Sequence, residues 1–194
     1  MARRPISGIP ITVADRNIGR VPVDVASTGF FAGQEIRFFY EFNIPNTESR
    51  WIRAVLPVNS TLKYQRMTVD NGALRFRAWR DSTDNGPWST PASPTSGVFN
   101  RNPVAATEYG YTIQSTIEVG GNGAAGVDGT VSEIARVRSA GATAQQSTVG
   151  ETITSERGVA AGTYFIQLEN IAGSGATTGV YVFNLEERSG IITY

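Results

Sequence analysis

The chain has 194 residues with 17 basic and 17 acidic side chains, so its net charge is zero, and it contains neither cysteine nor histidine. The missing cysteine excludes disulfides, thiolate zinc sites and cysteine nucleophiles, and the missing histidine excludes serine–histidine triads and histidine metal sites. A chain without net charge has no global field to attract nucleic acid or an anionic membrane. We therefore expect no nucleic-acid partner, no membrane partner, no cofactor and no metal.

A chain of this length fits one domain, because all-β sandwiches and barrels reach about 200 residues without splitting. We therefore assign residues 1–194 to a single β domain. No apolar run approaches the roughly 20 residues that span a bilayer, and the N-terminus lacks the apolar stretch of a secretory signal. We expect the protein to be made and kept soluble in a cytoplasm until it assembles.

The N-terminal segment, residues 1–20, has the composition of an arm beside the sheet. Two arginines and Pro5 follow the first residues, and Pro10 interrupts the next extended piece. Proline cannot donate to a strand ladder, so the segment is either a first edge strand or a peripheral arm that lies on a neighbouring subunit.

The first strongly predicted strand covers residues 35–42. Its apolar side chains alternate with polar ones such as Arg37 and Glu41, which is the pattern of a half-buried antiparallel strand. A second strand is predicted over residues 51–56, and Pro57 ends it.

Residues 62–81 predict a hairpin with its turn at Asn71-Gly72. Asn-Gly between two alternating runs is the strongest short-range hairpin signal, because a type I′ turn needs positive φ at both central residues. Side chains alternate along a strand, so the second strand should place its apolar set inward: Leu74, Phe76 and Ala78.

The opposite face of that second strand carries Arg75, Arg77 and Trp79. Together with Arg66 or Tyr64 from the first strand, these residues predict an arginine and aromatic ladder. Such a ladder suits acidic groups of another protein, sugars or bases, or it pairs with acidic neighbours in its own sheet. We rank protein contact above sugar, and sugar above nucleic acid.

Residues 81–103 are a long connection rich in Ser, Thr, Pro, Gly and Asn. A structureless loop of this length is uncommon unless it is functional or held by a partner. Trp88 and Phe99 within it either pack onto the domain's own core or anchor a contact. Residues 81–86 have the oxygen density of a calcium loop but not its ligand spacing, so we predict no metal there.

The second half of the chain predicts further strands at residues 109–119 and, more weakly, 130–138. Residues 163–168 and 180–185 predict a second hairpin around the glycine-rich residues 172–179. No segment shows an apolar period of helical length. With about eight to ten strands, the predicted fold is all-β: an antiparallel β-sandwich (jelly-roll-like) or a barrel, with long Gly/Ser/Thr/Pro-rich loops.

Carboxylates are the conventional acid–base groups that remain, so a glycosidase-like pair is the one enzyme class worth testing. Solvated carboxylates paired with arginines are the preferred interpretation, and we predict that the chain is not an enzyme. The glutamates at strand positions are Glu35, Glu41, Glu118, Glu133 and Glu169.

Three stretches give the chain a recognisable texture: GGNGAAGVDG at 120–129, SAGATAQQSTVG at 139–150 and GVYVFNLEERSG at 179–190. In this texture the chain resembles virion structural proteins of tailed bacteriophages, which are cysteine-free, all-β and rich in small residues. The resemblance implies a non-enzymatic structural subunit of a phage particle, namely a capsid decoration (cement) protein that stabilises neighbouring capsid subunits. It also implies a location in the virion, with assembly in the host cytoplasm.

Two alternatives remain open. A tail, neck or fibre-adaptor subunit belongs to the same class of virion protein. A carbohydrate-binding module is suggested instead by Trp51, Trp79 and Trp88 and by the tyrosine-rich strands.

The expected partners are other virion proteins, the major capsid protein or tail proteins, together with further copies of this chain. We expect a homo-oligomer, with a trimer as one candidate form. All but one of the 17 basic residues are arginines, which are enriched at protein interfaces where lysine is depleted. The candidate interface residues are Arg75, Arg77, Trp79, Trp88 and Phe99.

Overall fold

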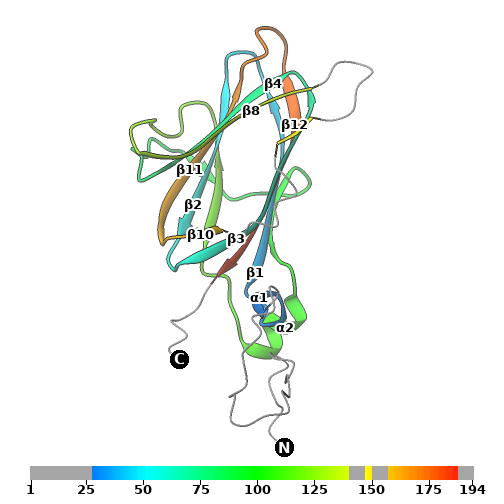
Figure 1. The fold of residues 1–194 in the computed structure, drawn as a ribbon, viewed down its shortest axis with the longest axis vertical. Helices are drawn as coiled ribbons and strands as arrows, with labels where there is room; N and C mark the ends of the chain where they lie inside the picture. Colours follow the sequence, from blue (N-terminus) through cyan, green and yellow to red (C-terminus); the bar gives the residue numbers. More distant parts are fainter. Residues whose placement is uncertain (1–27, 140–146, 150–156, 188–194) are drawn as a thin grey trace, which may run out of the picture.

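The computed structural model describes residues 28–139, 147–149 and 157–187 (Figure 1). The predicted arm at residues 1–20 lies outside these described residues.

The described chain folds into two antiparallel sheets that pack face to face. This confirms the predicted all-β sandwich, and the sheets are not closed into a barrel. Sheet A has the order β10 (Arg157–Val159), β3 (Ser60–Asn71), β12 (Thr177–Glu187), β1 (Glu35–Ile44) and β6 (Ser96–Asn100), with β9 (Ser147–Val149) also paired to β3. Sheet B has the order β5 (Trp88–Ser89), β7 (Thr116–Gly120), β2 (Ser49–Leu56), β11 (Gly162–Asn170), β4 (Ala73–Arg80) and β8 (Thr130–Arg138).

Among the described strands, none is hydrogen-bonded to the strand that follows it in the chain. The chain instead crosses from one sheet to the other at each step from β1 to β4, and again from β11 to β12. The central pairs are β1 with β12 and β12 with β3 in sheet A, and β2 with β11 and β11 with β4 in sheet B. This is the connectivity of a double-sheet jelly roll.

The predicted hairpin at Asn71-Gly72 is therefore wrong. β3 pairs with β12, β9 and β10, whereas β4 pairs with β11 and β8. Of the two turn residues only Gly72 has positive φ, at 90°, and a Cβ there would collide with Oγ1 of Thr177. Asn-Gly makes a corner between the two sheets here. Alternation along a strand specifies which face is buried, but it does not specify which strand lies alongside.

The second predicted hairpin is wrong for the same reason. Residues 163–168 lie in β11 of sheet B, and residues 180–185 lie in β12 of sheet A. The glycine-rich segment between them carries the chain across the sandwich.

One core fills the space between the sheets. The predicted inward positions of β4 are confirmed, because Leu74, Phe76 and Ala78 are all buried in it. They face Phe38 of β1 and Tyr181 of β12, whose ring lies 5.5 Å from that of Phe76. Each such large side chain contributes roughly 1.5–3 kcal/mol by leaving water.

Two short helices, α1 (Thr28–Phe31) and α2 (Pro103–Tyr109), lie together at one end of the sandwich (Figure 1). The sequence pattern predicts no helix here, and it predicts a strand over residues 109–119, whereas the strand begins only at Thr116. Local signals for α2 were present, since Asn102 caps it by accepting a hydrogen bond from the Ala105 amide and proline occupies its first turn. Its left-handed C-cap is Gly110.

The long connection at residues 81–103 is not structureless. It contributes β5 to the edge of sheet B and β6 to the edge of sheet A, where β6 pairs with β1. The segment thus passes from one sheet to the other and ends in α2.

Candidate interaction surfaces

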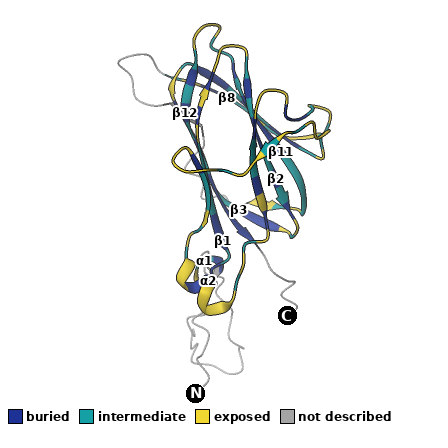
Figure 2. Ribbon diagram, turned by 180° about the vertical axis from the view of Figure 1, so that it is seen from behind, coloured by how far each residue is buried: buried dark blue, intermediate teal, exposed yellow. Residues whose placement is uncertain are grey.

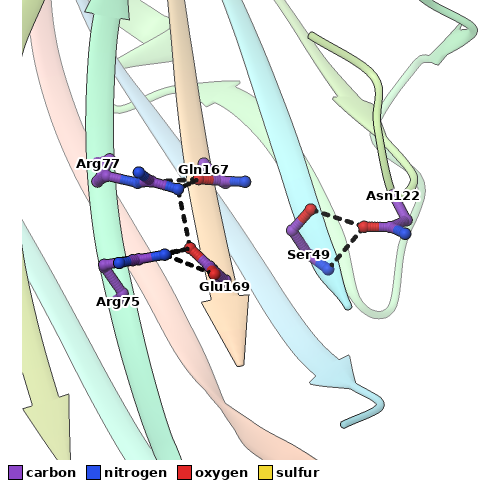
Figure 3. A network of polar contacts seen from close by, with 6 residues as sticks. All are labelled: Ser49, Arg75, Arg77, Asn122, Gln167 and Glu169. Atoms are coloured by element: carbon purple, nitrogen blue, oxygen red, sulfur yellow. Dashed lines mark hydrogen bonds and ion pairs between the residues drawn. The ribbon is translucent and has the colours of Figure 1, made fainter. Parts of the chain in front are cut away.

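The outer face of sheet B carries a cross-strand ladder of polar side chains (Figure 3). Register places Glu169 opposite Arg75, and Gln167 opposite Arg77. Arg75 donates from Nε and Nη2 to the two oxygens of Glu169 at 2.8 and 2.6 Å. Arg77 donates from Nη2 to Glu169 at 2.9 Å and to Gln167 at 2.7 Å. One carboxylate therefore holds both guanidinium groups, and the ladder is satisfied within the sheet.

Beside this ladder, tryptophans form a second apolar cluster on the outer face of sheet B. Trp51 and Trp79 are each 1% exposed, and their ring centroids lie 5.5 Å apart. Trp88 packs on Phe165 at 5.8 Å between ring centroids. We call these residues, together with Ala124 and Ala125, the tryptophan cluster. Its rings are shielded from water because residues 120–125 cover this face.

Asn122 fastens the covering segment to the start of β2. Ser49 donates to Oδ1 of Asn122 from its backbone amide at 3.1 Å and from its hydroxyl at 2.9 Å (Figure 3). The cover over the tryptophan cluster is therefore held by specific hydrogen bonds as well as by apolar contact.

Trp88 is further held by a clamp of charged groups. Its Nε1 donates to Asp84 at 2.6 Å, and the guanidinium of Arg53 lies 5.1 Å from its ring centroid. Arg53 pairs with both Asp84 and Glu118 at 2.5 Å. Burial alone would raise the pKa of Asp84, but the hydrogen bonds from Trp88, Arg53 and the Gly86 amide outweigh it and lower that pKa.

The same contacts use the carboxylate oxygens of the acidic loop at residues 81–86. Both oxygens of Asp84 accept hydrogen bonds, and the hydroxyl of Thr83 donates to Asp128. Within the described ranges, no group of three or more metal-ligating side chains is placed to hold an ion. In that same part of the chain, no helix is long and apolar enough to cross a membrane.

The outer face of sheet A is different, because its central arginines have no partner in the part of the chain that the structure describes. Arg37 of β1 and Arg66 of β3 line a hollow of about 330 Å³ together with Tyr64, Thr68 and Asp70. Among the described residues, neither arginine makes an ion pair or a side-chain hydrogen bond. We call this feature the sheet A hollow.

Exposed aromatic side chains extend from the sheet A hollow towards the helices. In register Phe99 of β6 stands opposite Arg37, and its ring lies 6.3 Å from that of Phe39. Phe99 is 45% exposed. At the end of the sandwich α2 is largely exposed (Figure 2), and Phe31 and Tyr109 are exposed large side chains of the two helices.

The five predicted interface residues do not form one surface. Arg75 and Arg77 are engaged in the ladder, Trp79 is buried in the tryptophan cluster, and Trp88 is half-buried against it. Phe99 lies on sheet A and is exposed.

The predicted grouping of Arg66 and Tyr64 with Arg75 is also wrong, since β3 and β4 belong to opposite sheets. Arg37 was assigned to the polar face of its strand but not to a site. Only the pairing of β1 with β12, and of β12 with β3, brings it near Arg66.

The strand glutamates are arranged mostly as ion pairs. Glu35 pairs with Arg101, and Glu41 is exposed. The other three pair with strand arginines: Glu118 with Arg53, Glu133 with Arg157, and Glu169 with Arg75 and Arg77.

Comparisons with models of known families, with curated proteins and with solved structures found no significant match. What the chain does has to be inferred from its own surfaces.

Proposed function

We propose that this chain is a non-enzymatic structural subunit of a phage particle, a capsid decoration protein that bridges neighbouring capsid subunits. The observation that carries the proposal is the unequal use of arginine on the two outer faces. Sheet B neutralises Arg75 and Arg77 internally, whereas Arg37 and Arg66 of sheet A, beside exposed Phe99, have no partner within the described part of the chain.

An unpaired arginine beside an exposed aromatic ring suits docking onto an acidic protein surface. The planar guanidinium binds carboxylates in a bidentate way, and arginine with large aromatic residues supplies most of the energy at protein interfaces. The partner of the sheet A hollow is therefore an acidic patch of another virion protein. Double-sheet jelly rolls occur in viral capsid domains but also in lectins and cupins, so the fold by itself does not select among these functions.

The alternative of a carbohydrate-binding module rests on three tryptophans and on the tyrosine-rich strands. In the structure Trp51 and Trp79 are buried and Trp88 is half-buried, all three in one intramolecular cluster. These tryptophans leave no open platform of stacked rings, so that alternative loses the three tryptophans that suggested it.

Self-association is supported by the helical end of the sandwich. Phe31, Val104 and Tyr109 are 64%, 76% and 67% exposed there, and they lie on two helices that contact each other through Asn102 and Phe30. Exposed apolar side chains gathered at one place favour burial against a second copy. Light scattering of the purified chain should give a multiple of 20.8 kDa, and a monomer at the highest soluble concentration would contradict this part of the proposal.

Immunogold electron microscopy tests the location. Particles produced by the strain that encodes the chain are labelled with an antibody raised against the purified protein. Label spread over the head supports a decoration protein, whereas label at one vertex or on the tail supports the tail, neck or fibre-adaptor alternative. Particles without label would overturn the virion assignment altogether.

A further inference from the structure

An apolar cavity of about 280 Å³ lies between the two sheets, away from both outer faces. Phe76 and Ala78 of β4 form part of its wall from sheet B, and Tyr181 and Phe183 of β12 form part from sheet A. Burial raises the pKa of Tyr181, and the carboxylate of Glu133 adds to that rise, so its phenol is neutral at physiological pH. The cavity is therefore a largely apolar space bounded by uncharged rings.

Three polar side chains converge on this cavity from different strands. Arg157 of β10 donates from Nη2 to Glu133 of β8 at 2.5 Å and to Gln65 of β3 at 2.8 Å. Gln65 donates from Nε2 to Glu133 at 3.4 Å. All three line the cavity, and Arg157 and Glu133 are 50% and 28% exposed at their side chains. The cluster thus stands where the cavity meets solvent.

Gln65 and Glu133 occupy positions that otherwise point into the core. Gln65 lies two residues before buried Met67 on the same strand, and Glu133 stands opposite Ala78 in register. Polar groups are rarely placed inside an apolar core unless they serve a partner or protect an edge strand by an inward-pointing charge. Their convergence on one cavity, together with the apolar walls, is the arrangement of a small-molecule pocket.

We propose that this cavity binds a small uncharged alcohol, whose hydrocarbon body fills the apolar space and whose hydroxyl meets Gln65 and Glu133. An apolar cavity of about 150 Å³ holds benzene, so this volume suits a ligand of about ten non-hydrogen atoms. A hydroxyl can donate to the carboxylate of Glu133 and accept from the amide of Gln65 at the same time. A carboxylate ligand is disfavoured, because it would have to displace Glu133 from Arg157 and leave a negative charge without its partner.

The test compares three probes of the same skeleton on the full chain: 3-phenyl-1-propanol, propylbenzene and 3-phenylpropionate. Binding is followed by calorimetry and by amide chemical shifts. We expect the alcohol to bind with a Kd of about 1 mM or below, and propylbenzene about three- to tenfold more weakly, as one hydrogen bond predicts. The carboxylate should bind weakest. If none of the probes binds, the pocket assignment is overturned, and if the hydrocarbon binds as well as the alcohol, the role of the polar cluster is overturned.

Two variants on β4 test whether the alcohol binds in this cavity. Ala78→Leu fills the cavity from its wall, so we expect it to reduce alcohol binding at least tenfold with little change in the unfolding midpoint. Ala73→Leu, at an equally buried alanine of β4 that lies outside the core cluster and does not line the cavity, should keep binding and lower the midpoint, because the larger side chain overpacks a buried position. Unchanged binding by Ala78→Leu contradicts the site.

Gln65→Leu provides a variant of the polar cluster. It should reduce the preference for 3-phenyl-1-propanol over propylbenzene, because the hydroxyl keeps only its hydrogen bond to Glu133, while binding of propylbenzene persists. If the preference is undiminished in Gln65→Leu, the amide does not hold the hydroxyl and the proposed pose is wrong.

Discussion

The central strands of the two outer faces use arginine and aromatic residues in opposite ways. On sheet B, Arg75 and Arg77 share Glu169, and a covering segment buries Trp51 and Trp79. On sheet A, Arg37 lies in an open hollow and has no ion-pair partner among the described residues. The difference shows that arginines and aromatics on a strand do not by themselves mark a binding surface. Whether such a face is open to a partner depends on whether the neighbouring strand supplies a carboxylate and whether a loop covers the rings.

A covered face contributes to stability, and an uncovered one is free for a partner. Substitutions on the outer face of sheet B should therefore change the free energy of unfolding, whereas substitutions on the outer face of sheet A should leave it nearly unchanged. The predictions run from the largest expected effect to the smallest.

Trp79→Ala should destabilise the fold by about 3–5 kcal/mol, since it removes a fully buried ring from the tryptophan cluster. Phe99→Ala on sheet A is the matched control, with an expected loss of about 1 kcal/mol or less because its ring is half in water. Urea unfolding followed by circular dichroism measures both. Equal losses in the free energy of unfolding for the two variants would contradict the contrast between the two outer faces.

Glu169→Gln should cost about 1 kcal/mol, because it takes the shared charge away from Arg75 and Arg77 in a half-exposed ladder where solvent screens the ion pairs. A double-mutant cycle with Arg75→Ala isolates the pairwise part. A coupling energy of zero would show that the ladder in Figure 3 does not contribute to stability.

Asp84→Asn should lower the unfolding midpoint by a smaller amount, and only above acidic pH. The pKa of Asp84 is lower in the folded protein than its ordinary value of 3.8, so its stabilising contribution is present above that value and is lost as the pH falls through the folded pKa. The midpoints of wild type and variant, measured between pH 7 and pH 2, should therefore converge at the acidic end. A constant difference over the whole range would contradict the clamp around Trp88.

Arg37→Ala and Arg66→Ala should each change the free energy of unfolding by less than about 0.5 kcal/mol, as expected of surface residues that have no partner among residues 28–139, 147–149 and 157–187. Urea unfolding under the conditions used for Glu169→Gln gives a direct comparison. A loss above about 1 kcal/mol in either variant would reveal an internal partner and remove its arginine from the proposed docking surface.

Much of the fold could be predicted from periodicity. The strand at residues 130–138 and the inward set of β4 needed only alternation, because a half-buried strand exposes one face to water. Strand partners could not be predicted this way. From β1 to β4, and from β11 to β12, successive strands lie in opposite sheets, and Asn71-Gly72 serves as a corner as readily as it serves as a turn.

The candidate sites depended on those partners. Arg75 finds its carboxylate on β11, more than 90 residues away in the chain, so sequence neighbours gave no sign that it is neutralised. Arg37 and Arg66 become one feature only when β12 lies between their strands. The residue types were enough to predict which face of a strand is polar. Which of those polar faces stays free depends on pairing between strands that are far apart in the sequence.

Co-sedimentation with phage particles from the encoding strain tests the free face most directly. Particles stripped of the chain are mixed with wild-type protein, with the double variant Arg37→Glu/Arg66→Glu, or with Arg136→Glu/Arg138→Glu, which makes the same charge change on exposed residues of β8 in sheet B. We predict that wild type and the β8 variant bind, and that the sheet A variant loses at least tenfold in affinity. Undiminished binding by the sheet A variant, or no binding by wild type, would contradict the account.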